Sequence, residues 1–255
     1  MSNSSINEDW NTAASRKVTG VLVAVILVVS ALSFTGIGSY YNAYAQDNRN
    51  GINNNNNNLG VQITEPTPEL TAQWWQWLLS FPVDENPATD TTGEDCSKGD
   101  FGDTFFLAGT LGGKAERECT ITEGQDILIP IVTTICATIT GETAESLLAQ
   151  CADFTEQTRN LKLIIDRNQV RNLEDNRVTV ESLFTISDLP ENNLFGLPAG
   201  SSIDAVADGY WVLIENLSAG EHDITVVGKQ HGHLSSGEKW DLKTDVTYHL
   251  SVEGE

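Results

Sequence analysis

The sequence predicts a mainly β protein: a β-sandwich or jelly-roll-like body with an N-terminal tryptophan-rich helix and one further helix. Two observations support this class. The chain contains many short runs of β-forming residues, separated by turns rich in glycine and serine. No regular alternation of strands with helical segments is visible, which argues against a parallel βαβ sheet.

The first ordered element is expected to be a helix that begins at residues 67–69. Thr67 is a suitable cap, Pro68 fits the first turn and Glu69 is an early acid. Apolar residues then follow at helical spacing, and Pro82 ends the helix. These apolar residues are Leu70, Trp74, Trp77, Leu78 and Phe81.

The rest of the chain favours strands. Runs with β composition lie at 104–108, 118–121, 127–134, 161–165, 178–186, 209–215, 222–228 and 245–252, and a second helical pattern lies at 143–158. In the last run, apolar and polar residues alternate from Val246 to Val252, which predicts one buried face. We expect a single β-rich extracytoplasmic domain over 66–255, and the pattern leaves a subdivision near residue 158 open.

The N-terminal region has the pattern of an export signal. Arg16 and Lys17 precede an uncharged apolar run from Val18 to Phe34, and Ala43-Tyr44-Ala45 supplies a small-x-small cleavage site. Residues 1–45 are therefore predicted to be a signal peptide or a membrane anchor, and the cleavage site favours the former. Both fates place the rest of the chain outside the cell or on its surface.

If the signal is retained, residues 18–37 are the expected membrane contact. Residues 46–65, with six consecutive asparagines at 53–58, are predicted to be a disordered tether. The acidic composition gives a formal net charge of −22. Such a charge opposes nucleic-acid partners and anionic lipid surfaces.

Four cysteines lie in the exported part: Cys96, Cys119, Cys136 and Cys151. An even number in an exported chain indicates two disulfide bonds, and three pairings are conceivable. We favour Cys96–Cys119 and Cys136–Cys151 because each closes a modest local loop. A zinc site is disfavoured because the paired knuckle spacing is absent.

Several short phrases resemble a family of uncharacterised exported microbial proteins. They are Trp74-Trp75-Gln76-Trp77, Asn86-Pro87, Asp90-Thr91-Thr92-Gly93 with Cys96, Phe106-Leu107-Ala108-Gly109-Thr110, Arg117 with Cys119, Gly209-Tyr210-Trp211-Val212 and Ala219-Gly220-Glu221-His222. The resemblance spans roughly 70–252. It implies a secreted protein with disulfides, including the pair 96–119, and brings no activity with it.

Three tryptophans of the first helix, Trp74, Trp75 and Trp77, are the candidate ligand-binding residues. Trp74 and Trp77 share a helix face, whereas Trp75 is rotated by about 100° from Trp74. An exposed Trp75 would stack on a sugar ring or on a partner protein. The alternative is that all three pack in the core.

Two further candidate sites concern metals. The acidic loop at 84–103, with Asp90 and Asp95, has the oxygen ligands that calcium prefers, but it lacks the usual spacing of a calcium loop. His231 and His233 form an H-x-H pair that would bind copper or zinc if His222 or His249 completed the site. Calcium is the cofactor that the sequence allows.

The function expected is a non-catalytic binding or structural role at the cell surface, with a glycan or an envelope protein as the ligand. The chain lacks a G-x-S-x-G elbow, a P-loop and an H-E-x-x-H motif, so an enzyme is the less favoured interpretation. A secreted carbohydrate-active hydrolase is one alternative, and it requires two carboxylates facing a pocket. A metal-binding extracytoplasmic protein is the other.

Overall fold

A computed structural model describes residues 60–138, 141–233 and 239–254. The described part is mainly β, as predicted. Its helices are α2 (Pro68–Leu79) and α3 (Ala144–Thr155). Its strands are β1 (Gln62–Thr64), β2 (Asp100–Phe101), β3 (Thr104–Phe106), β4 (Gly113–Thr122), β5 (Asp126–Ala137), β6 (Thr158–Ile165), β7 (Asn168–Gln169), β8 (Arg177–Ile186), β9 (Ile203–Glu215), β10 (Gly220–His233) and β11 (Lys239–Glu253).

The strands form two sheets that pack face to face. Sheet A has the order β1-β9-β5-β3-β2, with β8 also paired to β9, and sheet B has the order β4-β11-β10-β6-β7. Both sheets are mixed, because β4 runs parallel to β11 and β3 runs parallel to β5. Each sheet contains strands from before and after residue 158, so the segments on either side of that position build one sandwich.

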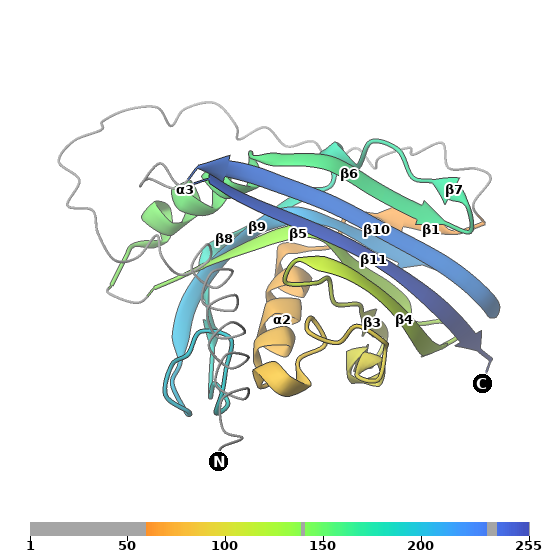
Figure 1. Cartoon of the computed structure of the whole chain (residues 1–255), viewed down its shortest axis with the longest axis horizontal. Coiled ribbons are helices and arrows are strands. Elements are labelled where there is room, and N and C mark those ends of the chain that lie inside the picture. The colour runs from red at the N-terminus through yellow and green to blue at the C-terminus, as the bar shows by residue number, and fades with distance from the viewer. Residues whose placement is uncertain (1–59, 139–140, 234–238, 255) are drawn as a thin grey trace, which may run out of the picture.

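Three layers result, as Figure 1 shows: sheet B, sheet A, and helix α2 on the far face of sheet A. Alternation along β5 and β9 divides the core. Ile127, Ile129 and Val212 point toward sheet B, whereas Leu128 and Trp211 point toward α2. Helix α3 packs on sheet A through a smaller cluster that includes Leu147 and Cys151.

The N-terminal boundary of the domain differs from the prediction. The tether was expected to extend to residue 65, but Gln62–Thr64 form β1 and pair with β9. Ile63 is 7% exposed and belongs to the inter-sheet core. Pairing with β9, the buried Ile63 and the partly buried Val61 hold this end of the segment against the sheet. The predicted signal or anchor, and the rest of the tether, lie outside the described residues.

Helix α2 begins where its sequence predicts, but it ends at Leu79 with Ser80 as its C-cap, so Phe81 lies beyond the helix. The Thr67 side chain accepts a hydrogen bond from the Leu70 N–H at 3.2 Å, and Pro68 occupies the first turn. Strand β4 is longer than predicted. Lys114, Glu116 and Glu118 alternate with buried residues along it, so half of its positions look like loop in the sequence.

Both predicted cysteine pairs are present. Cys96 and Cys119 have Cα atoms 5.5 Å apart, and Cys136 and Cys151 have Cα atoms 5.9 Å apart. The first joins the 96–99 turn to β4, and the second joins β5 to α3. Two disulfides indicate an oxidising environment. Among the described residues, none of the helices is long and apolar enough to cross a membrane.

Candidate functional site

An apolar cavity of about 180 Å³ lies between α2 and the two sheets. Trp74, Trp75 and Leu78 form its α2 side, and the segment 109–111 forms one wall. The other lining residues are Ala88, residues 130–133 of β5, Gly228 of β10 and residues at the start of β11. We call this space the tryptophan cavity. It extends from buried residues to a partly exposed rim that includes Leu111, Trp240 and Leu242.

Two irregularities in the sheets shape this cavity. The pairing of β5 with β9 shifts between Pro130 and Val132, and the pairing of β10 with β6 shifts at Gly228. A proline has no N–H to donate to a neighbouring strand. It is tolerated at a bulge because the regular hydrogen-bond pattern is interrupted there. A Cβ atom at Gly228 would lie 2.1 Å from a Val132 methyl group, so only glycine allows this approach of β10 to β5.

The structure buries all three candidate tryptophans. Trp74 is 2% exposed, and Trp75 and Trp77 are each 8% exposed. The stacking platform expected from an exposed Trp75 is therefore not formed. The physical reason is that α2 is covered on several sides, by sheet A and by apolar residues of 189–197. Trp74 and Trp75 line the cavity instead, and Trp77 contacts Phe106 and Phe81.

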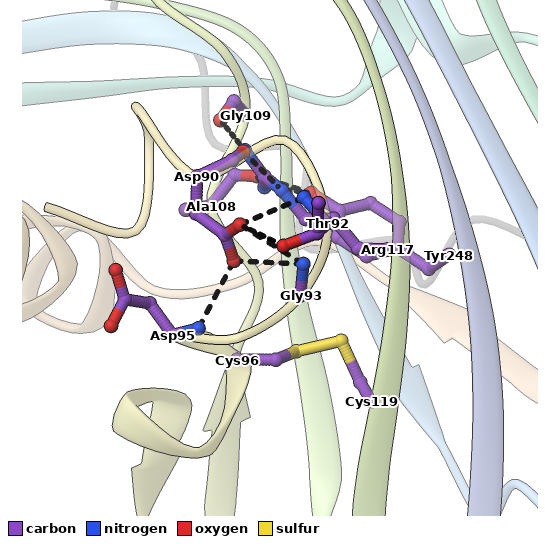
Figure 2. Close-up of a disulfide and its surroundings, with 10 residues drawn as sticks. All are labelled: Asp90, Thr92, Gly93, Asp95, Cys96, Ala108, Gly109, Arg117, Cys119 and Tyr248. Atoms are coloured by element: carbon purple, nitrogen blue, oxygen red, sulfur yellow. Dashed lines mark hydrogen bonds between the residues drawn. A yellow bond between two sulfur atoms is a disulfide. The ribbon is translucent and has the colours of Figure 1, made fainter.

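A buried arginine binds the segment that leads into the cavity wall, and Figure 2 shows its hydrogen-bond partners. Arg117 is 2% exposed and donates to the carbonyl oxygens of Asp90 (2.7 and 2.9 Å), Gly109 (3.2 Å) and Ala108. Tyr248 also donates to the Ala108 carbonyl, and its hydroxyl lies 3.3 Å from the guanidinium. Burial raises the pKa of Tyr248 to about 12, so its hydroxyl keeps its proton.

This network matters for the cavity because it fixes the segment that forms its wall. Arg117 binds residues 108 and 109, and Thr244 accepts hydrogen bonds from the N–H and hydroxyl of Thr110 at 3.4 and 3.2 Å. The Trp74 indole N–H donates to the Leu107 carbonyl at 2.9 Å. Residues 107–110 are thus held at four successive positions, and the wall is preorganised for binding.

The acidic loop has a structural role. The Asp90 carboxylate accepts from the backbone N–H groups of Thr92 (2.8 Å), Gly93 (2.9 Å) and Asp95 (3.1 Å). Partial burial alone would raise the pKa of Asp90, but these hydrogen bonds outweigh it and hold the pKa below its usual value. The loop then lies along the outer edge of β4, where Thr92 accepts from Glu118, and Cys96 secures it.

The two aspartates of the candidate calcium site, Asp90 and Asp95, therefore have partners within the protein. Both Asp90 oxygens face N–H donors, and the Asp95 carboxylate pairs with Lys98 at 2.8 Å. Within the described ranges, no group of three or more His, Cys, Asp or Glu side chains converges as metal ligands would.

Neither of the two residues expected to complete the histidine pair, His222 and His249, lies near His231. His231 lies on β10 nine residues from His222, a span of roughly 30 Å along a strand. His249 pairs in register with Asp223, also far from His231. Neither can complete a site with His231, because a strand is rigid and extended. The side chain of His233 lies outside the described part of the structure.

His249 instead lies between two carboxylates on the outer face of sheet B. Its Nε2 is 3.1 Å from Glu116 Oε1, and its Nδ1 is 2.7 Å from Asp223 Oδ1. The hydrogen bond to Glu116, and then that to Asp223, raises the pKa of His249 above its usual value. The charged imidazolium is therefore favoured by folding.

We expect this histidine to add a small, pH-dependent stability. Its contribution is complete below the unfolded pKa of about 6.5 and is lost as the pH rises through the raised folded pKa. The side chain is 40% exposed, so the gain is below about 1 kcal/mol. Urea unfolding of wild type and His249→Gln at about pH 5.5 and about pH 8.5 measures it. A stability difference that is equal at both values would contradict the assignment.

The hydrolase alternative calls for a pair of carboxylates at a pocket. The pKa of Asp126 is raised, first by burial and then by Glu215 and Asp103, but Asp126 does not line the tryptophan cavity. Among the described residues that line the cavity, Asp241 is the one carboxylate, and it pairs with Lys229 at 3.5 Å. The described lining of the cavity therefore does not contain the two-carboxylate arrangement.

Several residues of the site were not identified as such from the sequence. Leu111, Trp240 and Gly228 lie far apart in the chain and meet only through strand pairing. Pro130 was a usable signal, since a proline inside a β run predicts a bulge. Arg117 was noted only as part of a resemblance, and its burial has no sequence signature.

No family model, curated protein or solved structure matches this chain. The class of this protein is therefore defined by its fold only. It is a mixed β-sandwich with a helix on the outer face of one sheet and a cavity beneath that helix. The resemblance to exported microbial proteins stays a prediction.

Proposed function

We propose that this protein is exported and acts outside the cytoplasm, secreted or at the cell surface, as a non-catalytic binding protein. The export pattern at residues 16–46 supports this extracytoplasmic location. The two disulfides fit the oxidising compartment that export implies. The ligand places an apolar group in the tryptophan cavity.

The cavity is the observation that carries this proposal. Its lining is predominantly hydrophobic and aromatic, with a few polar groups, as is usual for small-molecule sites. A dry apolar cavity of about 150 Å³ is known to accept benzene, so a space of about 180 Å³ accommodates one ring or a compact branched group. The preorganised wall lowers the entropy cost of binding.

An apolar group fits the geometry better than a sugar. A sugar stacks on an exposed aromatic face and needs many hydrogen-bond partners, whereas the three helix tryptophans are buried. The ligand is then a small apolar molecule or an apolar part of an envelope component. Glycan binding becomes a competing outcome in the test.

We expect Leu111→Trp to block the cavity. Leu111 lines it and is partly exposed, so a larger ring there occupies the space without reaching the deep core. Wild type should bind cyclohexane or toluene with a dissociation constant near or below about 1 mM, and the variant should bind at least about tenfold more weakly. Ligand-observed NMR measures this, with a panel of oligosaccharides tested alongside.

Leu183→Trp provides the matched control. Leu183 lies on β8, is 44% exposed and does not line the cavity, so the same substitution should leave binding unchanged. Equal binding by wild type and Leu111→Trp would contradict the proposal. So would binding of oligosaccharides in the absence of any binding of the apolar probes.

A further inference from the structure

The indole N–H of Trp75 differs from those of its neighbours on α2. Trp74 donates to the Leu107 carbonyl at 2.9 Å, and Trp77 donates to the Lys98 carbonyl at 2.7 Å. The Trp75 N–H is buried and has no acceptor in the described part of the chain. Its ring lines the tryptophan cavity and packs edge-on against Trp74, with ring centres 5.0 Å apart. Burial of a donor without an acceptor is unfavourable and calls for an explanation.

Apart from the Trp240 indole, the polar side chains that line the cavity already have partners. The hydroxyls of Thr110 and Thr244 lie 3.2 Å apart, and the Thr133 hydroxyl donates to the Asp208 carbonyl at 3.5 Å. The Asp241 carboxylate lies at the exposed rim and pairs with Lys229. Among the described residues that line the cavity, the indole N–H groups of Trp75 and Trp240 are therefore the side-chain donors without an acceptor.

A second indole N–H, that of Trp240, is also buried without an acceptor among the described residues. It is a weaker candidate. The nitrogen lies 3.1 Å from the position that a Cβ of Gly232 would take, so it faces the neighbouring strand. The Trp240 ring also contacts Phe154, with ring centres 5.5 Å apart.

We propose that the ligand carries a neutral hydrogen-bond acceptor, such as a carbonyl oxygen, on a compact apolar body, and that Trp75 donates to it. This inference rests on the proposed binding function and names the ligand class. A neutral acceptor is favoured over a carboxylate because Asp241 lies at the rim and the chain as a whole carries a net charge of −22. The cavity volume sets the body at about one six-membered ring.

Cyclohexanone and cyclohexane test this inference, because they share a shape and differ by one acceptor. Trp75→Phe keeps an aromatic ring and removes the N–H. We expect the variant to bind cyclohexanone about tenfold more weakly relative to cyclohexane than wild type does, since the ketone loses its donor. Using the ratio of the two affinities cancels the change in cavity volume. Ligand-observed NMR gives both affinities.

Trp77→Phe is the matched control. Trp77 lies on the same helix, but its N–H is already paired and its ring does not line the cavity. This variant should keep the wild-type affinity ratio. An equal change in the ratio for both variants would overturn the role of Trp75.

A second measurement uses the wild-type protein, so the core is unchanged: it follows the NMR resonance of the Trp75 indole N–H. In wild type, saturating cyclohexanone should shift the Trp75 indole N–H resonance downfield, and cyclohexane should not. If cyclohexane binds but the ketone leaves that resonance and the affinity ratio unchanged, the acceptor inference is wrong and the binding function stands. If neither compound binds, both proposals fail.

Discussion

Replacing Arg117 with methionine should lower the free energy of unfolding by about 3–5 kcal/mol. The guanidinium is 2% exposed and donates to three carbonyl oxygens. Methionine keeps the length and apolar stem of the side chain but leaves the Asp90 and Gly109 carbonyls without this donor. In the described part of the chain, no carboxylate lies within ion-pair distance of Arg117, so the loss is one of hydrogen bonds.

Urea unfolding followed by tryptophan fluorescence measures this loss, provided that the slope against urea is unchanged. Arg117→Lys should lose about half as much, because lysine keeps a charge but cannot reproduce the planar fork. Arg159→Met is the control. Arg159 is exposed and also donates to backbone carbonyls, and its replacement should cost less than about 0.5 kcal/mol. An Arg117→Met variant as stable as this control would show that the network does not hold the wall.

Replacing Trp74 with alanine is the second large effect, with an expected loss of about 4 kcal/mol. The side chain is 2% exposed and lies at the centre of an aromatic cluster, with ring centres 5.0 Å from Trp75 and 5.1 Å from Trp211. The change removes this packing and also the hydrogen bond to the Leu107 carbonyl. That carbonyl then stays buried without its donor.

Trp75→Ala on the same helix is the matched comparison. Its N–H has no acceptor to lose and its ring borders an existing cavity, so the loss should be smaller by about 1 kcal/mol or more. Urea unfolding followed by far-ultraviolet circular dichroism avoids the change in fluorescence. A Trp75→Ala loss that equals or exceeds the Trp74→Ala loss would contradict this description of the cluster.

Local signals made much of the fold predictable. Thr67 and Pro68 mark the start of α2, and the alternation after Val246 identifies β11, because capping and pleating depend on neighbouring residues. Both disulfides followed from short loops. Strand β4 was seen only in part, since its outward residues are charged.

The site was less predictable because it depends on strand register. The cavity exists where bulges at Pro130 and Gly228 fall beside α2, and register is set by long-range pairing. Helical spacing placed Trp75 on a different face of α2 from Trp74 and Trp77. It gave no information on which other segments cover that face of the helix. The completion of the histidine pair by His222 or His249 also depended on strand geometry. His222 lies nine positions from His231 on β10, and the strand register places His249 opposite Asp223.

The central claim is that the tryptophan cavity binds a compact apolar group. Crystals soaked with bromocyclohexane test it directly, because anomalous scattering locates the bromine without ambiguity. We predict a bromine peak within the cavity, in contact with Trp74 or Trp75, and its loss in Leu111→Trp crystals. A cavity that stays empty while bromine is found only on the outer surface would contradict the claim.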